Sequence, residues 1–356
     1  CLKADDGAEL WRFEYVTDYV DRHGDNPGPR CCPVIDDGRV FVYGVEGLLH
    51  ALRLEDGTLL WKKDTAADFG VVPNFFGVGS TPLVEGDLLL TVVGGSPPNS
   101  PDIASGETQP AGSAVVAYDK RTGEVRYKTG DDLAAYGSPV AATIAGRRWC
   151  FVFARGGLLA FEPATGKVDF HFPWRAKSLQ TVNAMSPVVA GDLVFISDAY
   201  SIGGACLKIK AGGFEVVWQD GRKRERSMSS WWNTPVLVDG HLYGDSGLED
   251  SDLRGVELAT GAVTWTDKAL KHTSLLRVDG RFVGLTEDGI LWLLELTPQG
   301  CRKISEATLM DPDGRPFVRP PARAAPALSN GRLYVRGKDR LVSLQVAQGE
   351  APPLSS

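Results

Sequence analysis

The chain has 356 residues, of which 43% are hydrophobic, so it can bury a large core. Its formal net charge of -7 gives no basic surplus, which argues against a nucleic-acid partner because phosphate binding needs Lys and Arg. No run of about 18 apolar residues occurs, so no transmembrane segment is expected. With nucleic-acid binding and a transmembrane segment disfavoured, we expect an acidic globular protein that binds small molecules, polymers or proteins.

The first stretch, "CLKADDGAELWRFEY", combines alternating apolar residues, a turn that ends in Gly, and an aromatic residue four positions after that Gly. The pattern returns at residues 50–64, 115–129, 158–172 and 254–267. The aromatic residues of the five copies are Trp11, Trp61, Tyr127, Phe170 and Trp265. Such internal repetition predicts a repeat architecture.

A second element recurs ahead of these copies and consists of a small residue, usually followed by Pro, then an apolar run and a tight turn. It occurs seven times, at residues 32–44, 81–94, 138–154, 186–197, 234–244, 273–284 and 325–337. The mean spacing of about 49 residues is typical of a propeller blade with four short strands.

Pairs such as Asp-Gly and Asn-Gly within the apolar runs predict tight hairpins, and no convincing long amphipathic helix occurs. The sequence therefore predicts an all-β protein, a β-propeller of seven four-stranded antiparallel blades that forms a single domain over residues 1–346. We expect the tail at 347–356 to be disordered. The last unit, 325–346, contains three strands, so residues 9–15 are expected to pair with it and close the ring.

The repeat, with its small residue and Pro at each entry, resembles the PQQ-like β-propeller repeat of quinoprotein alcohol dehydrogenases and of BamB-type outer-membrane assembly lipoproteins. The stretches "NFFGVGSTP" (74–82), "GRRWCFVFARGGL" (146–158) and "WNTP" (232–235) resemble bacterial extracytoplasmic members of unknown role. The resemblance implies the fold and a periplasmic, secreted or cell-envelope location. Many relatives have eight blades, whereas this chain has seven entries.

Loop lengths differ between the two edges of the predicted blades. Successive turns of an antiparallel blade alternate between edges, so the A–B and C–D turns share one edge and the B–C and D–A loops share the other. The first set is short. The long segments belong to the second set and comprise residues 16–31, 65–80, 94–112, 173–185 and 219–233. We expect binding sites on this second edge.

Polar and aromatic side chains in these segments are the candidates for binding a ligand or partner, because uncharged hydrogen-bonding groups beside aromatic rings suit sugars, peptides or a flat cofactor. The alternative is that the Asn and Ser side chains satisfy backbone groups at the blade entries. The adjacent Trp pair also favours a protein interface. The candidates are Arg30, Asn74, Ser80, Trp174, Asn183, Trp231, Trp232, Asn233 and His272.

Catalytic and metal-binding motifs are absent from the sequence. The five His residues show no metal-ligand spacing, and no nucleophile elbow, phosphate-binding loop or paired-cysteine zinc motif occurs. Cys31 and Cys32 are a candidate vicinal disulfide, since quinoprotein alcohol dehydrogenases carry adjacent cysteines near a blade entry. Small residues that stand at a blade entry by coincidence are the alternative.

Two functions from different classes follow. The first is a non-catalytic, extracytoplasmic and monomeric scaffold that needs no cofactor or metal and binds a protein partner or a carbohydrate or peptide polymer. The second, implied by the family resemblance, is an oxidoreductase with PQQ and calcium. In it Cys31 and Cys32, or Trp231 and Trp232, would flank the quinone, and Asn183 or Asn233 would bind the metal. The absence of an identifiable catalytic Asp favours the first.

Overall fold

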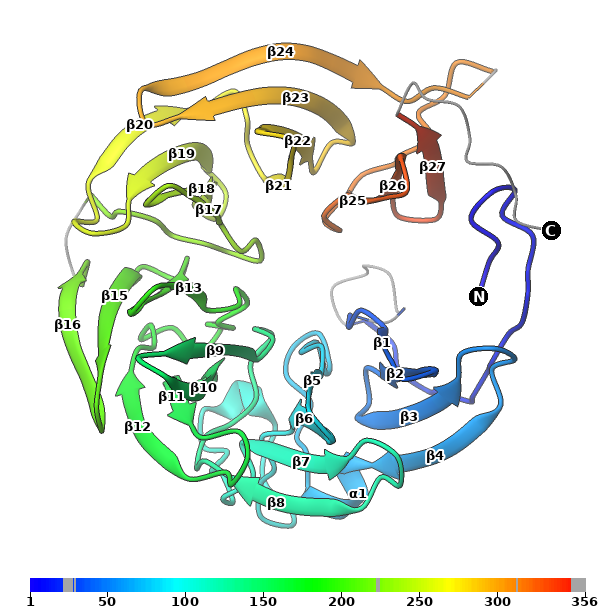
Figure 1. Ribbon diagram of the computed structural model, residues 1–356, viewed down its shortest axis with the longest axis vertical. Helices are drawn as coiled ribbons and strands as arrows, with labels where there is room; N and C mark the ends of the chain where they lie inside the picture. Colours follow the sequence, from blue (N-terminus) through cyan, green and yellow to red (C-terminus); the bar gives the residue numbers. More distant parts are fainter. Residues whose placement is uncertain (22–27, 29, 222–224, 312, 347–356) are drawn as a thin grey trace. The chain divides into compact units, whose positions relative to one another are not determined.

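The computed structural model describes residues 1–21, 28, 30–221, 225–311 and 313–346. Its strands form seven antiparallel sheets in chain order, six with four strands and the last with three among these residues. The fold is thus the seven-bladed β-propeller that the repeat predicted (Figure 1). We number the sheets blades 1 to 7 and label the strands of each blade A to D in chain order.

The chain separates into two compact units, residues 1–234 and 235–356, which are described separately. The single-domain organisation stays a prediction, and the tail at 347–356 lies outside the described residues.

The first unit contains blades 1 to 4. Their strands are β1 (Val34–Asp36), β2 (Arg39–Tyr43), β3 (Leu48–Arg53), β4 (Leu59–Asp64), β5 (Leu83–Glu85), β6 (Leu88–Val92), β7 (Val115–Asp119), β8 (Val125–Thr129), β9 (Val140–Ile144), β10 (Arg147–Phe153), β11 (Gly157–Phe161), β12 (Val168–Pro173), β13 (Val188–Ala190), β14 (Leu193–Asp198), β15 (Gly203–Lys210) and β16 (Gly213–Gln219). Two short helices, α1 (Thr65–Phe69) and the 3-10 helix η1 (Ile103–Ser105), lie in its loops.

The second unit contains blades 5 to 7. Their strands are β17 (Val236–Val238), β18 (His241–Ser246), β19 (Asp252–Glu257), β20 (Val263–Asp267), β21 (Thr273–Val278), β22 (Arg281–Thr286), β23 (Ile290–Thr297), β24 (Gly300–Thr308), β25 (Ala327–Ser329), β26 (Arg332–Arg336) and β27 (Leu341–Gln345).

Within each unit, apolar cores fill the space between neighbouring blades, namely blades 1 and 2, 2 and 3, 5 and 6, and 6 and 7. Phe41, Tyr43 and Leu49 of blade 1 pack with Leu89 and Tyr118 of blade 2, and all five side chains are fully buried. Alternate residues of the same strands point to opposite faces, so each inner strand supplies two cores. A buried Leu or Phe contributes about 1.5–3 kcal/mol, which makes these interfaces the main source of stability.

The repeated aromatic residue of strand D docks on the C–D turn of the next blade. Trp61 Nε1 donates a hydrogen bond to the Lys120 carbonyl at 3.2 Å, and its ring lies against Gly123. A Cβ atom at Gly123, whose φ is +72°, would lie 2.8 Å from that ring. Gly is therefore needed both for the turn and for the close approach of the ring.

A hydrogen-bonded ladder links the blade entries of the first unit. The residue before the entry Pro donates its backbone N–H to the hydroxyl at the same position of the next blade. The pairs are Cys32 to Thr81 at 3.0 Å, Thr81 to Ser138 at 3.1 Å, Ser138 to Ser186 at 3.0 Å and Ser186 to Thr234 at 2.9 Å. This hydroxyl ladder explains why a small polar residue recurs before each of these prolines.

Residues 1–15 form a hairpin like the C–D turns of the complete blades. Lys3 N–H bonds the Ala8 carbonyl and Gly7 N–H bonds the Lys3 carbonyl, as Arg53 and Gly57 do in blade 1. Leu2 pairs with Glu9, and the structure assigns no extended strand to residues 9–15. The predicted pairing of residues 9–15 with β27 stays a prediction.

We expect Ser138→Ala to lower the free energy of unfolding by about 1–2 kcal/mol, because it leaves the Thr81 N–H without its acceptor. Urea denaturation of the variant and of the exposed control Ser305→Ala, on β24, measures the difference. Equal midpoints for the two variants would show that the hydroxyl ladder does not stabilise the blade entries.

Candidate functional site

The long connections gather on one edge of blades 1 to 4, as the sequence predicted. They are the D–A loops at 65–82, 130–139 and 174–187, the described residues 220–221 and 225–234 after β16, and the B–C loop at 93–114. The predicted long segment 16–31 lies partly outside the described residues. The A–B and C–D turns on the opposite edge span two to six residues. We call the edge with the long connections the loop face.

A buried arginine in a short loop links two of these segments. Arg155, in the short B–C loop of blade 3, is only 1% exposed. Its Nη1 donates to Asn74 Oδ1 at 3.1 Å and to the Thr181 carbonyl at 3.2 Å, and its Nη2 donates to the Leu179 carbonyl at 2.8 Å. Burial, with the nearby Arg175, lowers the pKa of Arg155 to about 10. The guanidinium therefore stays charged at neutral pH and fixes the loops through neutral acceptors.

Three other candidate residues also bond the backbone. Asn183 Nδ2 donates to the carbonyls of Ala154, Arg155 and Trp174 at 2.8, 3.2 and 3.4 Å. Ser80 Oγ donates to the Gly137 carbonyl at 3.1 Å, and Trp174 Nε1 to the Gly203 carbonyl at 3.1 Å. All three side chains are buried. They shape the loop face, and their contact with a ligand stays a prediction.

A buried carboxyl closes the same network. Asp198, at the end of β14, accepts a hydrogen bond from Thr181 Oγ1 at 2.6 Å. Its Oδ1 and the Oδ1 of Asn183 are buried and have no hydrogen-bond partner among the described residues. Burial raises the pKa of Asp198 to about 6, because hydrogen bonds compensate only part of the lost hydration.

Partly exposed aromatic side chains lie in the D–A loops of this face. Phe76 and Tyr136 have ring centroids 5.9 Å apart, and Phe76 N–H donates to the Tyr136 hydroxyl at 2.7 Å. Trp231 and Trp232 have centroids 4.6 Å apart at 55°. Both pairs sit in D–A loops, so the loop face offers rigid rings of the kind that protein and sugar sites use.

The remaining candidates make none of the hydrogen bonds of Arg155 described above. Arg30 pairs with the carboxylate of Asp21, and its Nε donates to the Phe76 carbonyl at 3.4 Å. Asn233 follows the Trp pair and is partly buried. His272 belongs to the second unit, where its backbone N–H donates to Ser251 Oγ at 2.9 Å and Asp245 raises its pKa.

The sequence analysis missed Arg155 and Asp198, which organise the loop face. A signal was present for Arg155, since it is the single charge in the apolar run "CFVFARGGLLAF". No comparable signal marks Asp198, because Asp is also frequent in turns.

The two adjacent cysteines are free thiols in the structure. Cys31 is buried, and its Sγ lies 3.2 Å from the Ser80 carbonyl, whereas Cys32 is exposed. A disulfide between Cys31 and Cys32 would require the Cys31 thiol to leave this contact. The vicinal disulfide stays a prediction. Among the described residues, no group of three or more His, Cys, Asp and Glu side chains is placed to hold a metal ion.

Comparison with solved structures gives the same fold class. BamB from Moraxella catarrhalis is 16% identical, with a TM-score of 0.61 over 95% of this chain and 85% of that one. Quinohemoprotein alcohol dehydrogenase from Comamonas testosteroni is 14% identical, with a TM-score of 0.60 over 94% of this chain and 66% of that one. The computationally designed Ika8 protein is 10% identical, with a TM-score of 0.50 over 90% and 98%. These likenesses show the β-propeller fold.

The family itself is shown by sequence. The model described as "Outer membrane protein assembly factor BamB" matches residues 1–267, and the chain belongs to this family of PQQ-like β-propellers. No curated protein matches the chain. No described helix has the length and apolar character needed to cross a membrane.

Asp198→Asn tests the buried carboxyl. The folded-state pKa is raised, so the folded protein binds a proton that the unfolded chain releases, and stability falls as pH rises from about 4 to about 6. We expect Asp198→Asn to raise the free energy of unfolding by about 2 kcal/mol at pH 7.5 and to have no effect below about pH 4. Urea denaturation across pH measures this, with the exposed Asp288→Asn as control. A pH-independent difference would contradict the assignment.

Proposed function

We propose that the protein is a non-catalytic, extracytoplasmic binding scaffold whose loop face holds a protein partner or an extended carbohydrate or peptide polymer. The observation that carries the proposal is the combination of a buried framework, centred on Arg155, with the partly exposed rings of Phe76, Tyr136, Trp231 and Trp232. The loop that carries Phe76 is fixed through Asn74, so it loses little conformational entropy on binding, and we expect the two Trp rings to add apolar anchors.

Family membership supports a protein as the partner. The family is described as an outer-membrane protein assembly factor, and a solved BamB shares the fold. The same likeness favours a location outside the cytoplasm, in the periplasm or cell envelope.

The Trp pair gives the direct test. We expect Trp231→Ala with Trp232→Ala to weaken the partner complex by about 2 kcal/mol, or roughly thirtyfold, because the two rings act as anchors. The partner is first cross-linked to the wild-type protein in a cell-envelope extract, identified by mass spectrometry, purified and titrated.

The matched control is Leu59→Ala with Leu60→Ala, which truncates two partly exposed apolar residues of strand β4. It should leave the affinity unchanged. A large loss of thermal stability in the Trp variant, with full affinity, would place the two rings in the packing between blades and remove them from the site.

The alternative, an oxidoreductase with PQQ and calcium, draws on the shared fold of a quinohemoprotein dehydrogenase and on the adjacent cysteines. The residues do not fit this cofactor. A flat quinone needs a slot between parallel surfaces, whereas the Trp231 and Trp232 rings are tilted by 55° and the Cys31 thiol is buried against Ser80. Asn183 could offer one amide oxygen, but its amide nitrogen is held by three carbonyls.

We therefore propose that the scaffold works without PQQ or calcium. Titration with PQQ in the presence of calcium, followed by calorimetry and by Trp fluorescence, should give no micromolar complex. Addition of alcohols or sugars should likewise leave a dye acceptor oxidised. A tight complex that requires calcium would replace the scaffold proposal by the oxidoreductase.

A further inference from the structure

His272 links three segments of the second unit. It is the last residue of the loop between strands β20 and β21. Its backbone N–H donates to Ser251 Oγ in the B–C loop of blade 5 at 2.9 Å, and its carbonyl accepts from the Glu287 N–H in the B–C loop of blade 6 at 3.1 Å. Its φ of +47° is uncommon for a residue other than glycine, so the surrounding contacts must hold this conformation.

The imidazole of His272 faces a buried carboxylate. Its Nδ1 lies 3.2 Å from Ser251 Oγ and 3.7 Å from Oδ2 of Asp245, which belongs to strand β18. The Asp245 side chain is only 1% exposed, and its Oδ1 is buried without a hydrogen-bond partner among the described residues. In this part of the chain, His272 is the one residue that forms an ion pair with Asp245.

Asp245 controls the charge of the imidazole. Its interaction with His272 raises the pKa of the ring above the ordinary value of 6.5, although burial opposes the rise. Glu287 raises this pKa further, whereas Arg323 lowers it. Arg323 Nε donates to Glu287 Oε1 at 2.8 Å, so these two charges largely offset each other, and Asp245 is the decisive partner.

The B–C loop of blade 5, residues 247–251, is tied down by this contact. Ser251 at its end is 2% exposed and bonds both the backbone N–H and the ring of His272. An ion pair between Asp250 and Lys271, at 3.0 Å, joins the same two loops. Both of its side chains are well exposed, so it contributes little to holding the loop.

Loss of the proton from His272 removes the cation beside Asp245. The folded-state pKa of His272 is raised, so the stabilisation from this pair is fully present below about pH 6.5 and is lost as pH rises through the higher folded-state value. Above that value the Asp245 carboxylate is a buried charge with a neutral neighbour, which is costly. Opening of the loop would relieve this cost, because water would then reach the carboxylate.

We propose that His272 and Asp245 form a pH-sensitive clamp, which holds the B–C loop of blade 5 closed when His272 is protonated and releases it when His272 is neutral. The loop carries the exposed carboxylates of Glu249 and Asp250, so the clamp regulates how this unit presents negative charge. All groups of the clamp lie within residues 235–356. The clamp does not depend on the scaffold function proposed above or on any ligand.

Titration of the full chain tests the charge of the ring directly. Nuclear magnetic resonance with 15N-labelled histidine follows each imidazole, and the spectrum of His272→Asn assigns the signal of His272. We expect a pKa of His272 above 6.5 in the wild type and a lower value in Asp245→Asn, which removes the negative charge. A pKa at or below 6.5 in the wild type, or no change in Asp245→Asn, would overturn the proposal.

Hydrogen exchange tests the release of the loop, after correction for the intrinsic pH dependence of exchange. We expect protection of residues 247–252 in the wild type to fall at least about fivefold between about pH 5.5 and about pH 8.5. His272→Asn, which suits a positive φ but carries no charge, should give the weak protection at both pH values. Asp245→Asn should give the strong protection at both, because no buried charge is left without a cation.

The matched control is His241→Gln, which replaces the histidine on β18 whose ring contacts the Asp239 carbonyl. It should keep the fall in protection seen in the wild type. Equal protection of the wild type at the two pH values, or a fall that persists in His272→Asn, would show that the pair does not control the loop.

Discussion

The hydroxyl ladder at the blade entries is the interaction on which the arrangement of the first unit depends. The backbone N–H groups of Cys32, Thr81 and Ser138 each donate to the hydroxyl at the entry of the following blade, so these three steps fix the distance and the register of neighbouring sheets in blades 1 to 4. The residue after each of these positions is Pro, which has no N–H and holds the chain extended. Apolar packing alone is not directional, and the ladder supplies the direction.

The loop face follows from this fixed register. Once the entries of blades 1 to 4 are aligned, the D–A loops leave them at set positions, and Arg155 can reach Asn74, Leu179 and Thr181 together. This network costs folding stability because it buries two ionisable groups. Burial lowers the pKa of Arg155 and raises the pKa of Asp198, so it favours the neutral form of each. A network that costs stability and fixes loops suits a recognition surface, where preformed geometry raises affinity.

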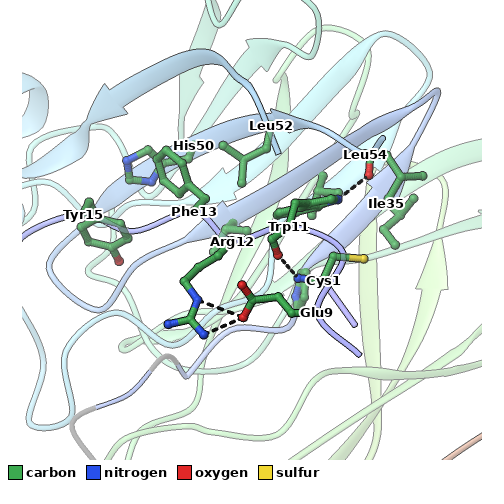
Figure 2. Close-up of a pocket in the computed structure, with 13 residues that line it drawn as sticks. Cys1, Glu9, Trp11, Arg12, Phe13, Tyr15, Ile35, His50, Leu52 and Leu54 are labelled. Carbon is green, nitrogen blue, oxygen red and sulfur yellow. Dashed lines mark hydrogen bonds and ion pairs between the residues drawn. The ribbon is translucent and has the colours of Figure 1, made fainter. Parts of the chain in front are cut away.

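The N-terminal hairpin packs on blade 1 through the same aromatic contact that joins blade 1 to blade 2 (Figure 2). Its turn repeats the hydrogen bonds of a C–D turn, and Trp11 docks as Trp61 does. The contact between the aromatic ring of a D strand and the glycine of the next C–D turn therefore forms without the inner strands. The inner strands add the apolar core between blades 1 and 2.

The sequence by itself determined the all-β class, the seven repeats, the hairpin turns and the unequal edges. These follow from local chemistry, such as Gly at positive φ in Asp37–Gly38 and alternation of apolar residues along each strand. Only the tertiary structure decided which side chains meet. Asn183, Ser80 and Trp174 bind backbone carbonyls of other segments. Arg155, whose one sequence signal is its charge within an apolar run, and Asp198, which has none, become central because residues far apart in the chain surround them. Long-range burial sets hydrogen-bond partners and pKa values, and it cannot be read from local patterns.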